Sequence, residues 1–142
     1  MSQVVAAGRR RRAAALALSA CLAAALVAPE SVAADPLIER TELRRAPLEG
    51  TPGTVVVMTR LEATPGARLP RHTHPGDEML YVLQGGRIQP LGRPEQAVEA
   101  GSTMRFPRGE AHGGFTVVGE RTIRVLTVHV VDADKPLMQV ME

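Results

Sequence analysis

The spacing of its short apolar runs constrains this chain more than any other feature of the sequence. After residue 35 helical periodicity is nearly absent, and runs rich in β-branched residues alternate with glycines and prolines about every ten residues. The runs lie at 54–63, 79–84, 102–106, 114–118 and 121–131. Short strands at this spacing predict one all-β domain, a sandwich or barrel of antiparallel strands.

Residues 1–33 have the composition of a signal peptide that is removed on export. Four arginines at 9–12 precede an alanine-rich apolar run at 13–28, and small residues follow at the spacing that signal peptidase accepts. The apolar run is too short and too weakly apolar to predict a stable membrane span; an uncleaved N-terminal anchor is the alternative. We expect a protein of the periplasm or cell envelope, with an extended N-terminal arm at 34–53 and a barrel domain at 54–142.

Cys21, the only cysteine, lies inside this leader. The segment "LSAC" at 18–21 resembles a lipobox, in which Cys21 would be acylated and become a lipid anchor. The apolar run continues past Cys21, which favours an ordinary signal peptide instead. In either case the mature domain has no cysteine left to form a disulfide.

The charge of the mature domain argues against nucleic acid as a partner. The whole chain has 17 basic and 15 acidic residues, but residues 1–33 hold four arginines and one glutamate, which leaves 13 basic against 14 acidic residues. The only aromatic residues are one tyrosine and two phenylalanines. Such a domain has neither the positive field nor the stacking surface that nucleic-acid binding requires.

Four candidate metal ligands lie in two short segments. His72 and His74 are two residues apart, so on a strand they share one face, and a turn at 75–77 places Glu78 beside them. His112 follows a second turn. Three imidazoles and a carboxylate predict a site for one divalent transition metal ion: Fe, Mn, Ni, Cu or Zn. The alternative is a polar cluster that holds no metal.

At these residues the chain resembles the cupins, and in particular small exported bacterial cupins of the quercetin-dioxygenase-like cupin-2 type. The first cupin motif, G(X)5HXH(X)3–4E(X)6G, is matched by Gly66, His72, His74, Glu78 and Gly85. The second, G(X)5PXG(X)2H(X)3N, is matched by Gly101, Pro107, Gly109 and His112, with Thr116 in place of the final Asn. In cupins this Asn is usually a hydrogen-bonding, structural residue and not a metal ligand, and the Thr hydroxyl can also donate and accept a hydrogen bond.

The resemblance implies a double-stranded β-helix, the jelly-roll barrel of cupins, with one metal ion inside it. It carries the ligand role onto His72, His74, Glu78 and His112, and makes Glu78 the candidate catalytic residue. Cupins include both enzymes and binding modules, so the fold does not choose between them. One interpretation is a metal-dependent dioxygenase acting on a small enol or catechol-like substrate. The other is a non-catalytic metal- or ligand-binding module of the cell envelope. A homodimer formed through an outer strand face is also expected.

Other polar residues carry weaker signals. His129, alone on an apolar strand, is predicted to be a core or rim residue rather than a ligand. Tyr81 is assigned to packing or to a dimer face. Arg68, Arg71 and Arg105 could bind an acidic substrate if they face the mouth of the barrel, although such arginines more often face solvent.

Overall fold

The computed structural model describes residues 35–141, so the predicted signal peptide and Cys21 lie outside the described residues. The strands are β1 (Ile38–Pro47), β2 (Thr54–Ala63), β3 (Arg68–Leu69), β4 (His72–Thr73), β5 (Gly76–Gln84), β6 (Gly86–Pro90), β7 (Gln96–Val98), β8 (Thr103–Phe106), β9 (Phe115–Val118), β10 (Ile123–Asp132) and β11 (Gln139–Val140). The described residues contain no helix long and apolar enough to cross a membrane. The all-β prediction is confirmed.

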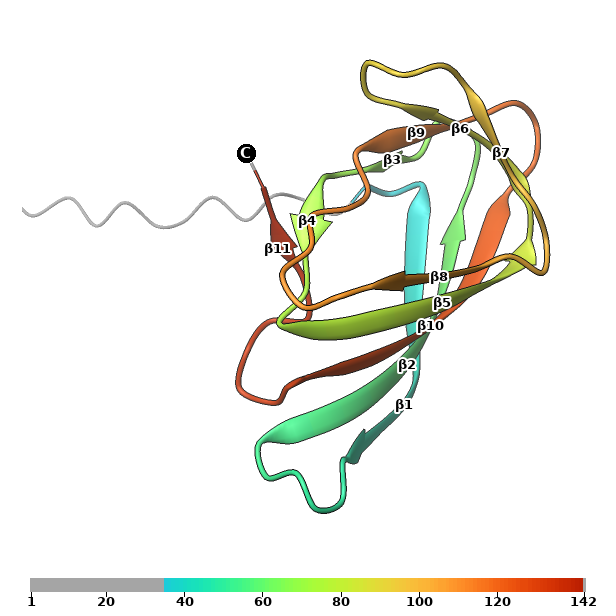
Figure 1. Cartoon of the computed structure of the whole chain (residues 1–142). Coiled ribbons are helices and arrows are strands. Elements are labelled where there is room, and N and C mark those ends of the chain that lie inside the picture. The colour runs from blue at the N-terminus through green and yellow to red at the C-terminus, as the bar shows by residue number, and fades with distance from the viewer. Residues whose placement is uncertain (1–34, 142) are drawn as a thin grey trace, which may run out of the picture. The chain divides into compact units, whose positions relative to one another are not determined.

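The strands form two larger sheets and one small one. The five-stranded sheet has the order β1-β2-β10-β5-β8, the four-stranded sheet has the order β3-β9-β6-β7, and β11 pairs with β4. In Figure 1 the five-stranded sheet curves beneath the four-stranded sheet, and β4 lies at one end between them. All pairings are antiparallel, as the short connections and frequent turns of the sequence require.

Burial alternates along the central strand β10, as expected where one face of a sheet is covered. Ile123 and Val125 point inward at one end of this strand, and they pack with Leu61, Val82 and Val117 in the hydrophobic core. Farther along the same inward face the residues become polar, because Thr127 and His129 follow. The interior therefore has an apolar end and a polar end.

The segment at 34–53 differs from its prediction as an arm outside the barrel domain. Most of it forms β1, which pairs with β2 as an edge strand of the five-stranded sheet, with a register shift between Glu42 and Arg44. The sequence did not predict this strand, because its side chains are largely charged and exposed, as is common on edge strands. Strands β6 and β7 also lack a clear sequence signal, since glycines and prolines interrupt that stretch.

Gly85 illustrates why glycine is needed where the chain passes from one sheet to the other. A Cβ atom at this position would lie 2.2 Å from the carbonyl oxygen of Val98 and 2.9 Å from the amide nitrogen of Ala100. Any side chain would push these strands apart. The close approach of the backbone therefore requires glycine at position 85.

Candidate functional site

The four predicted ligands converge at the polar end of the interior. His72 lies on β4, His74 follows that strand directly, Glu78 lies on β5, and His112 lies in the connection between β8 and β9. One ligand atom from each residue can be chosen so that all four lie within 4.8 Å of one another. His72, His74 and Glu78 are buried, with 2%, 4% and 5% of their surface exposed.

Backbone pairing brings the two motifs together. The amide nitrogen of His72 donates to the carbonyl oxygen of His112 at 2.9 Å, and that of His112 donates to the carbonyl oxygen of His72 at 3.0 Å. This close approach requires glycine at position 113, where φ is +77° and a Cβ atom would lie 2.5 Å from the carbonyl oxygen of Pro70. The His112 ring also stacks on Phe106, with ring centroids 4.0 Å apart.

All three histidines are held in the orientation that a metal ligand needs. In each, Nδ1 lies within hydrogen-bonding distance of a backbone carbonyl oxygen, to which it donates as N–H. The acceptors for His72, His74 and His112 are Pro70, Leu137 and Glu110, at 2.8, 2.5 and 3.0 Å. In a neutral imidazole with Nδ1 protonated, Nε2 carries the lone pair. Carbonyls of this kind commonly fix the tautomer of metal-binding histidines.

Glu78 lies at the centre of the cluster as an ionised carboxylate. Its Oε2 atom is 2.9 Å from His112 Nε2 and 3.0 Å from His74 Nε2. Burial raises the pKa of Glu78, but the adjacent imidazoles of His112 and His74 lower it by more, so that the pKa lies well below its usual range. Burial lowers the pKa of His112, yet the hydrogen bonds to Glu78 and to the Glu110 carbonyl raise it overall. When His112 is protonated on both ring nitrogens, its Nε2 donates to the Glu78 carboxylate.

These residues fit a divalent transition metal ion. The donor set of three imidazole nitrogens and one carboxylate oxygen is one that Fe, Mn, Ni, Cu and Zn all accept. His74 Nε2 is buried and makes no hydrogen bond of good geometry, despite its 3.0 Å separation from Glu78 Oε2. Buried polar atoms are rarely left without a partner, and a bound cation would satisfy this one together with the other lone pairs.

His129 lies directly behind the cluster and is fully buried, as its core prediction required. Its ring centroid is 4.7 Å from that of His74, and its Nε2 is 3.8 Å from Glu78 Oε1. The same Nε2 lies 2.9 Å from the Thr127 hydroxyl oxygen, which is 2.7 Å from that of Thr59. His129 therefore supports the site through a hydrogen-bonded row of buried side chains and is separate from the group of ligand atoms.

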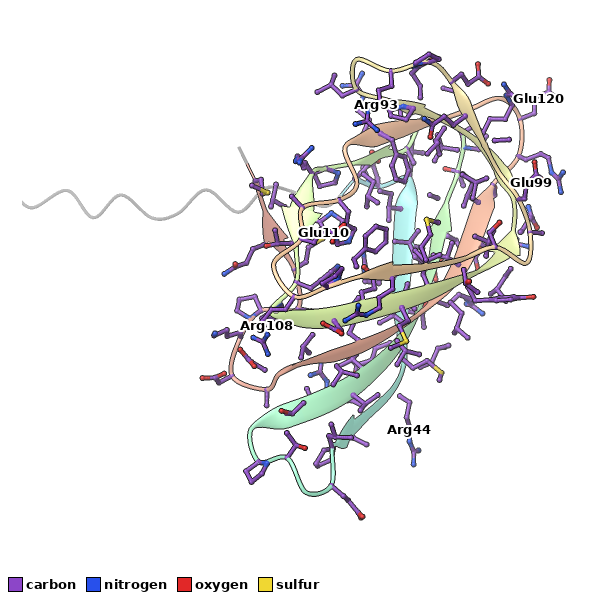
Figure 2. All side chains as sticks on the ribbon, in the orientation of Figure 1. Arg44, Arg93, Glu99, Arg108, Glu110 and Glu120 are labelled. Carbon is purple, nitrogen blue, oxygen red and sulfur yellow. The ribbon has the colours of Figure 1, made fainter. Side chains whose placement is uncertain are left out.

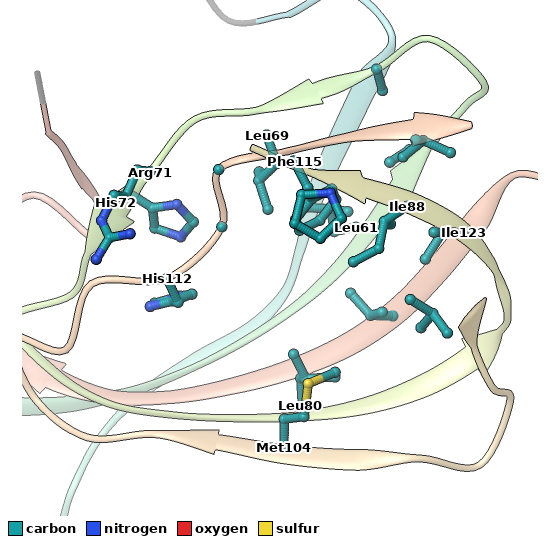
Figure 3. A pocket seen from close by; sticks show the side chains of 18 of the residues that line it. Leu61, Leu69, Arg71, His72, Leu80, Ile88, Met104, His112, Phe115 and Ile123 are labelled. Carbon is teal, nitrogen blue, oxygen red and sulfur yellow. The ribbon is translucent and has the colours of Figure 1, made fainter. Parts of the chain in front are cut away.

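A cavity of about 700 Å³ opens beside the cluster. Glu78, His72 and His112 line its polar end, and Figure 3 shows His72 and His112 on one side with Leu61, Ile88 and other aliphatic side chains beyond them. Cavities of about 300–1,000 Å³ with apolar walls and a few polar groups are typical small-molecule sites. A ligand in this cavity would have immediate access to the cluster.

The three arginines singled out in the sequence have different positions. Arg71 lines the cavity, whereas Arg105 pairs with Asp77 at 2.6 Å on the exterior and Arg68 lies outside the cavity. Sequence reasoning missed Arg40, which also lines the cavity. The sequence contained little indication of this role, because Arg40 occurs in a charged segment that lacks clear apolar alternation.

Thr116, which replaces the final Asn of the second cupin motif, lies on β9. Its hydroxyl makes no hydrogen bond to the four cluster residues in the described structure.

Fold and site together define an all-β barrel protein with a buried three-histidine, one-glutamate cluster that is typical of a metal site. The chain belongs to the cupin family: the family profile described as "Cupin domain" matches residues 59–129, which is half of the chain. The recognition of cupin motifs in the sequence and the jelly-roll expectation are thereby confirmed. A comparison with curated protein sequences finds no match.

Two solved structures agree on the fold. The chain is similar to an uncharacterized protein with a double-stranded beta-helix domain from Klebsiella pneumoniae, with 18% identity and a TM-score of 0.54 over 78% of this chain and 89% of that one. It is also similar to a cupin-2 domain from Rhodospirillum rubrum, with 18% identity and a TM-score of 0.54 over 80% and 71%. The DMSP lyase DddQ from Ruegeria pomeroyi is 20% identical with a TM-score of 0.49, over 61% of this chain but only 43% of the lyase.

Proposed function

We propose that this chain is an exported metal-binding cupin that acts as a metal-dependent oxygenase on a small enol or catechol-like molecule. The observation that carries the proposal is the opening of the ligand cluster onto an apolar cavity, because Glu78, His72 and His112 line that cavity themselves. A buried metal site without such an opening would suit a purely structural role. Export is supported by the composition of residues 1–33 alone.

His72, His74, Glu78 and His112 would hold the ion. A bound divalent transition metal would supply Lewis acidity and, if it is a redox-active ion, redox chemistry towards dioxygen. The chain supplies the rest: the aliphatic walls exclude water from the bound molecule, and the three Nδ1 hydrogen bonds keep the imidazoles oriented. Glu78 is ionised at neutral pH and reaches the cavity, so its carboxylate can accept a proton from the substrate hydroxyl.

Metal analysis and oxygen consumption test this proposal. The purified protein is assayed for bound metals and then for oxygen uptake with a panel of polyphenols and diketones. We expect about one ion per chain and uptake with at least one compound, because the donor set and cavity suit chelating oxygen ligands. Glu78→Gln should abolish the uptake, and Glu120→Gln, an exposed carboxylate away from the cavity, is the matched control.

The second candidate is a non-catalytic metal- or ligand-binding module of the cell envelope. It is favoured by the cavity walls, which are mostly aliphatic and include only Phe106 and Phe115 as aromatic residues. Aromatic substrates usually meet more aromatic surface than this. Stoichiometric metal without oxygen uptake on any member of the panel would select the binding module over the enzyme.

A further inference from the structure

Arg40 differs from every other arginine in the described part of the chain. Six arginines form ion pairs with carboxylates at the surface: Arg45, Arg60, Arg87, Arg105, Arg108 and Arg124. The arginines without such a pair are exposed to water, with the exception of Arg40. Arg40 is half-buried and has no carboxylate within ion-pair distance among residues 35–141, so its charge is partly desolvated and lacks a paired carboxylate.

Arg40 lies in the wall of the cavity, so its positive charge is available to a ligand there. Arg40 lies on β1 opposite Leu61, whose side chain belongs to the core, and both residues line the cavity. Arg40 and Glu78 line the same cavity, and no ion pair joins them in the described structure. Burial lowers the pKa of Arg40, and the Glu78 carboxylate raises it by a smaller amount. Glu78 is already engaged by His112 at 2.9 Å. The Arg40 guanidinium therefore retains donors for another acceptor.

The charge balance of the cavity also favours an anionic ligand. Three arginines line it, Arg40, Arg71 and Arg93, against the single carboxylate of Glu78. Arg71 and Arg93 are exposed, and Figure 2 shows Arg93 in the loop between β6 and β7. A cleft lined by one sign of charge with apolar walls concentrates ligands of the opposite sign. A metal ion at the cluster would add further positive charge.

We propose that the cavity selects small organic anions, with the apolar part of the ligand among the aliphatic walls and its carboxylate paired with Arg40. This narrows the substrate class of the proposed function, and it rests on that function in taking the cavity as the ligand site. Arg40 would be a specificity-determining residue. Its guanidinium can bind both oxygens of a carboxylate at once, which a neutral ligand cannot match.

Matched probes test the role of charge. Octanoate and octan-1-ol have the same chain length, and their affinities are measured by calorimetry on the purified protein, both metal-loaded and stripped with a chelator. We expect octanoate to bind about tenfold or more tightly than octan-1-ol in both forms, as a charge-assisted pair implies. Arg40→Met should remove the preference and leave octan-1-ol binding nearly unchanged. Arg40→Lys should restore part of it.

Arg44→Met is the control, because Arg44 lies on the same strand, is exposed and projects away from the cavity (Figure 2). Equal affinity for both probes, absence of binding by either, or an unchanged preference in Arg40→Met would each overturn the inference. Metal content, measured on the same samples, separates the two proposals. Normal metal loading without a carboxylate preference refutes only the anion selectivity, and the preference without metal loading refutes only the metal-dependent function.

Discussion

His112 Nε2 lies 2.9 Å from Glu78 Oε2, although 34 residues separate them in the sequence. This contact joins the two cupin motifs into one site. It depends on the backbone pairing of His72 with His112, which sets the position of the ring, and on Phe106, which stacks against it. Without that pairing the cluster would hold two imidazoles and one carboxylate from a single hairpin.

Removing one histidine from each motif should abolish metal binding. In the double variant His72→Ala, His112→Ala, two of the four donors are lost, and the remaining pair cannot hold an ion tightly. Metal content measured by mass spectrometry should fall from about one ion per chain to a background level. Circular dichroism shows whether the variant is folded. Normal metal content in the folded double variant would refute the site.

Replacing His129, which is buried but is not one of the four predicted ligands, should leave metal binding nearly intact. His129→Gln should retain nearly normal metal content, since Nε2 of His129 contacts Thr127 and lies 3.8 Å from Glu78 instead of joining the ligand atoms. We expect a loss of about 1–2 kcal/mol in the free energy of unfolding, because a buried hydrogen-bonded side chain is disturbed. A large loss of metal in a stable His129→Gln protein would show that His129 is itself a ligand.

Two glycines with the same φ angle should differ in their tolerance of alanine. Gly113 and Gly119 both have φ of +77°, but a Cβ atom at Gly119 meets nothing within 4 Å, whereas at Gly113 it would lie 2.5 Å from the Pro70 carbonyl oxygen. Gly119→Ala should cost about 1 kcal/mol through backbone strain alone. Gly113→Ala should cost clearly more in chemical denaturation and should also weaken metal binding, because the His72 ring would have to move. Equal losses would contradict this account.

The stability of the metal-free protein should fall as the pH falls below neutrality. Burial lowers the pKa of His72 and of His129 to about 4, whereas an unfolded histidine titrates near about 6.5. Between these values the unfolded chain binds protons that the folded chain does not, so lower pH favours unfolding. The raised pKa of His112 acts in the opposite sense.

The contribution of His129 can be isolated by comparing variants. Between about pH 7 and pH 4.5, the unfolding temperature of the metal-free wild-type protein should drop by about 5 °C more than that of His129→Gln, which lacks one of the two titrating groups. Thermal unfolding followed by circular dichroism measures both. Parallel curves for the two proteins would exclude a buried neutral His129.

The sequence predicted the class of fold and the composition of the cluster for local reasons. Residues two apart on a strand share a face, and this rule alone predicts that His72 and His74 point to the same side. Turn residues at fixed intervals predicted short antiparallel strands, and five such runs each contain or overlap an observed strand. β1 was not predicted, because this edge strand is largely charged and exposed and shows no apolar alternation.

What the sequence determined by itself is the set of donors and their spacing, because side-chain direction along a strand follows from the alternation of the backbone. Only the tertiary structure decided what surrounds those donors. Arg40 enters the cavity because β1 pairs with β2, and His129 lies behind Glu78 because β10 pairs with β5. The pairing of β10 with β5 joins segments distant in sequence, and the register of both pairings depends on how the whole interior is filled, which no local pattern contains.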